Sequence, residues 1–236
     1  MTSKLRLNLG CGRVTHAAYV NIDFNYLLKI SKIPTKSFFL KFFGVFYSHA
    51  EKVLVHDLRR GIPFGDDSAD VIYHSHFLEH LDYKDVDATL REIHRVLKVG
   101  GVHRIAIPNF EYLIRQIQVD IDNFDRYKTF SGSAENIYKL LEQSVRKTPA
   151  RTLELHPSLQ GFAVFLLGDA QSRGETHQMM YSKPAIYEIL ERNGFSNINF
   201  CTFENSRILD WPQINLDINQ SGSEVHPGSI YVECTK

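Results

Sequence analysis

The sequence Leu5-Arg-Leu-Asn-Leu-Gly-Cys-Gly12, followed by Tyr19-Val-Asn-Ile-Asp23, decides the fold of this chain of 236 residues. A short apolar run ends in two glycines one residue apart, and a second apolar run ends in an acid. This order predicts a buried strand, a glycine turn that lets backbone approach a ligand, and a carboxylate placed to accept ribose hydroxyls. The third glycine of a dinucleotide-binding fingerprint is missing, which argues against a dinucleotide cofactor.

Predicted strands and helices alternate through the rest of the first half. A strand ending at Asp57, a second strand over 71–74, a helix starting at Asp82 and a third strand over 102–108 follow in order. The helix carries Val86, Leu90, Ile93 and Leu97 at helical spacing, and Gly100-Gly101 is expected to end it. Near the C-terminus, Pro184 and Gly194 bound a further predicted helix, and strands follow over 195–203 and 229–235. This alternation favours a parallel sheet with helices on both faces.

Six motifs occur in one order and spacing: Asn-Leu-Gly-Cys-Gly (8–12), Asn-Ile-Asp (21–23), Asp-Leu (57–58), Ser-Ala-Asp-Val-Ile-Tyr (68–73), Leu-Glu-His (78–80) and Arg-Val-Leu-Lys-x-Gly-Gly (95–101). Together they resemble the class I methyltransferases that use S-adenosylmethionine, especially the small-molecule branch. The resemblance covers the first half of the chain and returns near the C-terminus. It implies an α/β fold, a Rossmann-like doubly wound sheet of about seven strands with the last strand antiparallel, plus helical lid insertions.

The resemblance also implies where S-adenosyl-L-methionine binds. The expected cofactor-binding residues are Asn8, Gly10, Cys11, Gly12, Asp23, Asp57, Leu58, His74 and Ser75. Asp23 would accept the ribose diol, because a carboxylate has two oxygens that can bridge neighbouring hydroxyls. Asp57 would receive the adenine amino group, with the Leu58 N–H offered to the ring. The alternatives are a plain turn at the glycines and local capping by the two acids.

Two departures from the family pattern concern the glycine turn. Asn8 stands where many relatives carry an acid that helps hold the methionine ammonium. The run from Gly12 to Asp23 is short for a full helix. We therefore expect the first crossover helix to be reduced to a turn or two.

Histidines gather after the predicted strand over 71–74, at His74, His76 and His80. One alternative is a zinc hydrolase that uses the His74–His80 loop with Glu79, but the spacing is one residue off that of binuclear zinc hydrolases, and no metal site is predicted. In the methyltransferase family this loop lines the reactive end of the cofactor. His76 and His80 are therefore candidate general bases, with His177 as the candidate from the lid side; purely structural histidines are the alternative.

Composition limits the expected binding partners of the protein and the cellular compartment in which it is expected to occur. Formal net charge is zero, so nucleic acid is not an expected partner. The three cysteines have no Cys-x-x-Cys spacing, which predicts neither a disulfide framework nor a structural zinc. The N-terminus lacks a secretory signal pattern, and no apolar run would span a bilayer. We expect a reduced, cytoplasmic, single-domain protein over 1–236; nothing in the sequence predicts its oligomeric state.

Two insertions, at about 26–50 and 110–176, leave near predicted strand ends and are the candidates for a substrate lid. The first is rich in lysine and aromatic residues, with Pro34 breaking any long helix. It is expected to cap the cofactor pocket; peripheral membrane contact and internal packing are the less favoured alternatives.

The predicted function is methyl transfer from S-adenosylmethionine to an oxygen or nitrogen of a small molecule or glycan precursor. The scheme requires no metal. A non-catalytic S-adenosylmethionine-binding protein is the first alternative, and the zinc hydrolase is the second. The identity of the acceptor is not predicted, because no motif occurs in the insertions.

Overall fold

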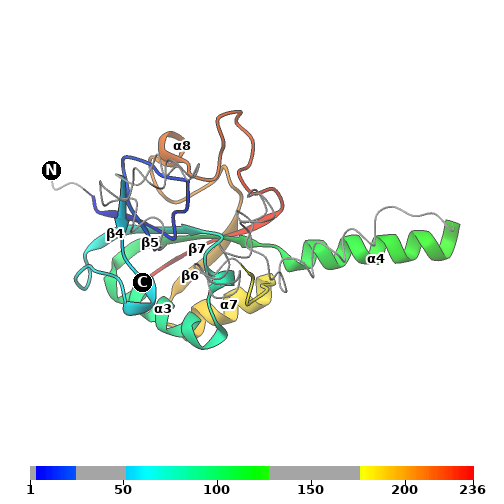
Figure 1. Cartoon of the computed structure of the whole chain (residues 1–236), viewed down its shortest axis with the longest axis horizontal. Helices are drawn as coiled ribbons and strands as arrows, with labels where there is room; N and C mark the ends of the chain where they lie inside the picture. The colour runs from blue at the N-terminus through cyan, green and yellow to red at the C-terminus, as the bar shows by residue number, and fades with distance from the viewer. Residues whose placement is uncertain (1–3, 25–51, 128–175) are drawn as a thin grey trace, which may run out of the picture. The chain divides into compact units, whose positions relative to one another are not determined.

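The computed structural model describes residues 4–24, 52–127 and 176–236 (Figure 1). These residues form two compact units. The first contains residues 4–24, 52–77, 84–107 and 183–236, and the second contains 78–83, 108–127 and 176–182. The predicted insertion at 26–50 and most of the insertion at 110–176 lie outside the described residues.

The first unit is built on a seven-stranded sheet in the order β3-β2-β1-β4-β5-β7-β6. The strands are β1 (Arg6–Leu9), β2 (Val20–Asp23), β3 (Val53–Val55), β4 (Ala69–Ser75), β5 (Leu97–Pro108), β6 (Ser196–Cys201) and β7 (Ser229–Thr235). Neighbouring strands from β3 to β5 pair in parallel, whereas β6 and β7 pair antiparallel. The last strand lies beside the fifth, which confirms the predicted fold class.

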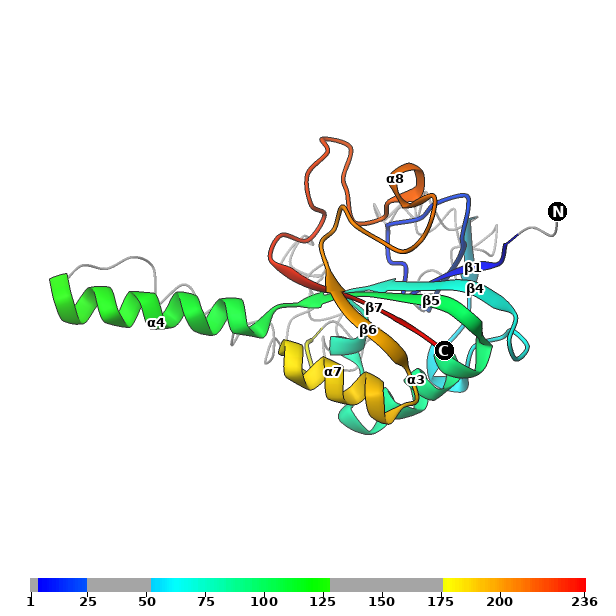
Figure 2. The same ribbon diagram turned by 180° about the vertical axis from the view of Figure 1, so that it is seen from behind.

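Helices cover both faces of this sheet. In Figures 1 and 2, α3 (Tyr83–Val96) and α7 (Lys183–Arg192) lie on one face, and the short α8 (Trp211–Ile214) lies on the other. The buried side of α3 carries Val86, Leu90, Ile93 and Val96, close to the predicted stripe. Two 3₁₀ turns, η2 (Leu58–Arg60) and η3 (Leu78–His80), follow β3 and β4. In the second unit, α4 spans Phe110–Tyr127.

The end of α3 differs from the prediction. The helix ends at Val96, and Leu97 begins β5 by pairing with Ala69. The next pair is Val71 with Val102, so the ladder is irregular between these pairs and Gly100, with a φ of +74°, lies inside the strand. The glycines therefore lie in a bulge of β5, after which pairing with β4 resumes, and they do not cap the helix.

Between β1 and β2 the chain forms turns and no helix. This confirms the expectation that the first crossover is reduced. It also leaves the loop after β1 short, so the glycine turn lies close to the end of β2.

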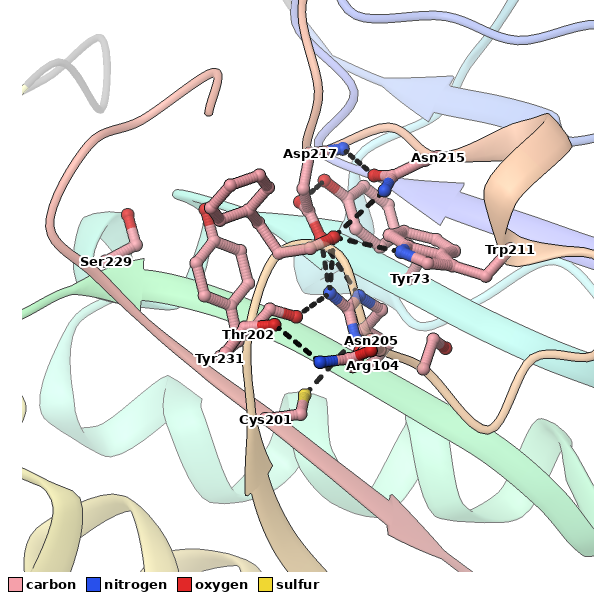
Figure 3. A network of polar contacts seen from close by, with 12 residues as sticks. Tyr73, Arg104, Cys201, Thr202, Asn205, Trp211, Asn215, Asp217, Ser229 and Tyr231 are labelled. Atoms are coloured by element: carbon pink, nitrogen blue, oxygen red, sulfur yellow. Dashed lines mark hydrogen bonds and ion pairs between the residues drawn. The ribbon is translucent and has the colours of Figure 1, made fainter. Parts of the chain in front are cut away.

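A buried ion network ties β5 and β7 to the segment that carries α8 (Figure 3). Arg104 of β5 has no exposed surface and donates to Asp217 at 2.9 Å and to Glu233 of β7 at 2.8 Å. The guanidinium also donates to the main-chain oxygens of residues 202 and 205 and lies 4.1 Å from the ring centre of Trp211. Tyr73 of β4 donates to the other oxygen of Asp217 at 2.6 Å. The charge in the core is thus paired and hydrogen-bonded, as burial demands.

Candidate functional site

The glycine turn after β1 is held by the carboxylate that ends β2. Gly10 and Gly12 have φ values of +60° and +52°, a region that glycine enters without strain. The Gly12 N–H donates to Asp23 Oδ2 at 2.8 Å, and the Phe24 N–H donates to Oδ1 at 2.6 Å. Asp23 therefore orders the turn that follows β1.

The two glycines differ in what surrounds them. A Cβ on Gly10 would lie 2.5 Å from the ring of Phe77, whereas a Cβ on Gly12 would meet no atom of the described residues within 4 Å. Gly10 thus allows an aromatic ring to pack on the turn, and Gly12 borders space that no described residue fills. Open space beside a positive-φ glycine is where a ligand can approach backbone closely.

Asn8 and Cys11 support the turn from inside the protein. The Asn8 amide donates to the Val14 carbonyl at 2.9 Å and to Asn21 Oδ1 at 3.0 Å. Cys11 is buried with Val53, and desolvation raises the pKa of its thiol to about 12. Their side chains serve the fold, so contact with a cofactor would fall to the backbone around them.

Asp57 lies after β3 and caps η2. Its carboxylate accepts from Arg59 Nε at 2.9 Å and Nη2 at 3.0 Å, and also from the Arg59 main-chain N–H. These bonds hold the pKa of Asp57 below its usual value. Leu58 is buried at the start of η2. Asp57 is thus a fixed anion at the strand end, paired with an exposed guanidinium.

His74 of β4 points into the core. The ring has no exposed surface, lies 5.0 Å from the His103 ring and 5.6 Å from Phe77, and neither nitrogen has a hydrogen-bond partner among the described residues. Desolvation lowers its pKa to about 3, so the ring is neutral. The His74 side chain therefore packs in the interior, whereas Ser75 is half-buried at the end of β4; their predicted contact with the cofactor stays a prediction.

His76 follows directly and has a φ of +50°, which is uncommon for a residue with a Cβ. Its Nε2 lies 2.9 Å from Ser229 Oγ, and its ring lies 4.0 Å from that of His226. Ser229 donates its own hydroxyl proton to the His226 carbonyl at 2.7 Å. The oxygen of Ser229 then accepts from His76 Nε2–H, which puts the lone pair of His76 on Nδ1.

The second unit brings Glu79, His80 and His177 together. Their ligand-type atoms all lie within 4.8 Å of one another, and the two imidazole rings are 5.0 Å apart. Glu79 has no exposed surface, and burial raises the pKa of its carboxyl to about 8. The sequence grouped His80 with His74 and His76, but these three side chains have different partners, so the zinc-hydrolase arrangement on the His74–His80 loop is not formed.

A small apolar pocket, partly open to solvent, also belongs to the second unit. Its walls include Phe110, Leu113, His177, Met179, Met180 and Tyr181. His177 thus lies among aromatic and thioether side chains in this pocket.

Residues 7–105 match the family described as a methyltransferase domain. This range holds the glycine turn, Asp23, Asp57 and the parallel strands that carry them.

Residues 7–105 therefore belong to a methyltransferase domain, and the strand order is the one predicted for class I, S-adenosylmethionine-dependent methyltransferases. Its cofactor is S-adenosylmethionine, as the motifs predicted.

Several solved structures resemble this methyltransferase at low identity. One is a SAM dependent methyltransferase from Archaeoglobus fulgidus, with 15% identity and a TM-score of 0.45 over 100% of this chain and 87% of the other. A possible histamine N-methyltransferase from Thermotoga maritima has 15% identity and a TM-score of 0.46, over 100% and 84% of the two chains. A methyltransferase from Mesorhizobium loti has 14% identity and a TM-score of 0.45, over 99% and 91%. A comparison with curated proteins finds no match.

Most of the cofactor residues expected of the methyltransferase lie at one edge of its sheet. Gly10 and Gly12 follow β1, Asp23 ends β2, Asp57 follows β3 and Ser75 ends β4. Because these strands are parallel, their carboxyl ends share an edge, which is where ligands bind in open α/β sheets. Sequence reasoning missed Phe77, His226 and Ser229. No local pattern marked them, since each matters only through a partner far along the chain.

Among the described residues, no helix is both long and apolar enough to cross a bilayer.

Proposed function

We propose that the enzyme methylates an oxygen or nitrogen of a small molecule or glycan precursor, with a histidine taking the acceptor's proton. Bound S-adenosylmethionine supplies an electrophilic methyl group on a positively charged sulfur. The residues proposed to hold it are the backbone at Gly12, the carboxylates of Asp23 and Asp57, and Ser75. Gly12, Asp23, Asp57 and Ser75 lie at or just after the carboxyl ends of neighbouring parallel strands, which supports this assignment. A Cβ on Gly12 would also meet no atom of the described residues within 4 Å.

His76 is the residue proposed to take the proton from the acceptor. A hydroxyl or amine acceptor loses a proton when it is methylated, so the reaction benefits from a positioned base. His76 follows the strand end next to Ser75, and its Ser229 contact directs the lone pair to Nδ1. Its left-handed backbone costs stability, and strain of this kind clusters at active sites. These features make His76 the favoured base; His80 and His177 remain the alternatives from the second unit.

The first step of the test is an acceptor screen. The purified enzyme is incubated with S-adenosylmethionine and a panel of hydroxyl- and amine-bearing compounds, including sugar precursors. Formation of S-adenosylhomocysteine is measured together with the mass and position of the added methyl. Methylation on carbon alone, or no turnover with any member of the panel, would contradict the proposed acceptor class.

The second step tests the base. His76→Ala should bind S-adenosylmethionine within about twofold of the parent, while turnover falls by about 10²- to 10⁴-fold. His94→Ala on α3 is the matched control and should keep parental turnover. Loss of turnover in His80→Ala or His177→Ala, with His76→Ala unaffected, would move the base to the second unit.

A further inference from the structure

Glu79, His80 and His177 form a cluster whose donor atoms are those of a metal site. Two imidazoles and one carboxylate are a common ligand set for zinc and for iron(II). His80 Nε2 lies 3.9 Å from Glu79 Oε1, and all three ligand atoms lie within 4.8 Å of one another. The cluster combines η3 with a segment 96 residues further along the chain.

Main-chain hydrogen bonds hold these two segments together. The N–H groups of Gln178 and Met179 both donate to the carbonyl of Glu79, at 2.6 and 3.1 Å. Tyr181 donates through its hydroxyl to the carbonyl of Leu78 at 3.4 Å. His177 is therefore placed beside Glu79 and His80 by the backbone and does not depend on side-chain contact alone.

A hydrogen bond to a carbonyl also sets the orientation of His80. Its Nδ1 lies 3.2 Å from the Thr176 carbonyl, which can only accept. Nδ1 therefore carries the proton, and Nε2 presents its lone pair on the side of Glu79. Metal-binding histidines are oriented in this way, with the second ring nitrogen donating to a carbonyl or carboxylate.

Glu79 is fully buried within this cluster. A divalent cation beside its carboxylate would favour the ionised form that a metal ligand needs.

We infer that Glu79, His80 and His177 bind one divalent first-row transition-metal ion. Ligand atoms bound at ~2.1 Å stand roughly 3–3.5 Å apart, so the side chains must close by about 1 Å. Three protein ligands leave positions for water or for oxygen atoms of another molecule. His177 also lines the apolar pocket together with Met179 and Phe110. A molecule that binds the ion through an oxygen atom could therefore contact these two side chains. The site goes beyond the proposed methyl transfer and does not depend on it.

Metal binding can be measured without cofactor or acceptor. The full chain is stripped with a chelator and dialysed against Zn²⁺, Mn²⁺, Fe²⁺ (anaerobically) or Co²⁺, one ion at a time. Elemental analysis should find one equivalent of at least one ion per chain. Bound Co²⁺ should give visible absorption bands that free Co²⁺ lacks.

Variants assign the ion to the cluster. Glu79→Gln and His177→Gln should each weaken binding by ~100-fold or more, since even outer contacts cost 10- to 100-fold. Glu188→Gln on α7 and His94→Gln on α3 are the matched controls and should bind like the parent. Circular dichroism checks that each variant is folded; should Glu79→Gln unfold, His177→Gln decides.

Two results would overturn the inference: no ion retained by the parent above the buffer level, or equal affinity in parent and cluster variants. A protein that binds the ion but not S-adenosylmethionine would contradict the proposed function and leave the metal site standing. Failure of the two ideas is therefore distinguishable.

Discussion

Gly10 and Gly12 both have positive φ values, but only one of them is a clean probe of ligand binding. A Cβ on Gly10 would clash with Phe77 at 2.5 Å, so a larger residue there disturbs the fold. The same atom on Gly12 would meet no part of the described structure within 4 Å. The sequence pattern alone makes Gly10 look like the contact position, whereas the packing moves the test to Gly12.

We predict that alanine at Gly10 mainly lowers stability, whereas alanine at Gly12 mainly weakens cofactor binding. Each substitution costs about 1–2 kcal/mol because the backbone stays left-handed. Gly10→Ala should lose more stability than this, seen as the larger decrease in melting temperature. Gly12→Ala should be the milder change for stability and should weaken S-adenosylmethionine binding by at least ~10-fold in calorimetric titration. Unchanged affinity in Gly12→Ala would show that the turn does not contact the cofactor.

Asp57 offers a second test at this scale. If its carboxylate accepts the adenine amino group, Asp57→Ala leaves that donor unmet, at about 1–3 kcal/mol. Affinity should fall by roughly 10- to 100-fold. Arg59 is exposed, so losing its partner should change the free energy of unfolding little. Arg59→Ala is the control and should retain affinity; a parallel loss would assign the effect to the pair and not to adenine.

At the scale of elements, Arg104 joins β5 to β7 and to the segment that carries α8. The guanidinium is fully buried, and its partners Asp217 and Glu233 are almost as well buried. Buried ion pairs add little compared with apolar packing, but removing one partner leaves charges without compensation. The network is therefore expected to fix where the segment over 202–217 lies.

We predict that Arg104→Met destabilises the protein by about 3–5 kcal/mol, because two buried carboxylates lose their cation. Chemical denaturation would measure the change in the free energy of unfolding. Arg192→Met is the matched control: its partner Asp87 is partly exposed, and the pair should be worth at most about 1 kcal/mol. Equal effects of the two substitutions would show that the buried network contributes no more than a surface pair.

At the scale of the whole molecule, two histidines lie in the interior of the sheet as neutral rings. Burial lowers the pKa of His74 to about 3, and burial together with His74 lowers that of His103 well below its usual value. Cys234 Sγ lies 3.6 Å from His103 Nδ1, and it offers no charge that would hold a protonated ring. Both rings therefore stay neutral in the folded protein at mildly acidic pH and take up a proton only when the protein unfolds.

The sign of the pH effect follows from these shifts. An unfolded histidine takes up its proton near pH ~6.5, whereas the folded His74 does so near pH 3. Between these values the unfolded state binds more protons, so stability is full above pH ~6.5 and decreases as pH falls, by about 1.4 kcal/mol per pH unit for each ring. In His103→Leu the slope of unfolding free energy against pH from ~6 to 4 should be smaller by about that amount. Parallel slopes in parent and variant would contradict the buried neutral state of His103.

The sequence by itself determined the order of the strands along the chain and the edge of the sheet where ligands are expected to bind. Apolar runs that end in Gly10, Asp23 and Asp57 are local patterns, and parallel pairing brings their ends to one edge without further information. The reduced first crossover was also readable, because a loop of that length cannot hold a full helix. The predictions for both insertions stay open, apart from α4, which is helical as expected.

Only the tertiary structure decided what each side chain contacts. Leu97 was predicted on the helix and is a strand residue, because pairing with Ala69 outweighs helical periodicity. His74, His76 and His80 are neighbours in sequence, yet His74 joins His103 in the core, His76 joins Ser229, and His80 joins His177. Local sequence encodes the period of an element, whereas a side chain's partner depends on which distant segment packs against it.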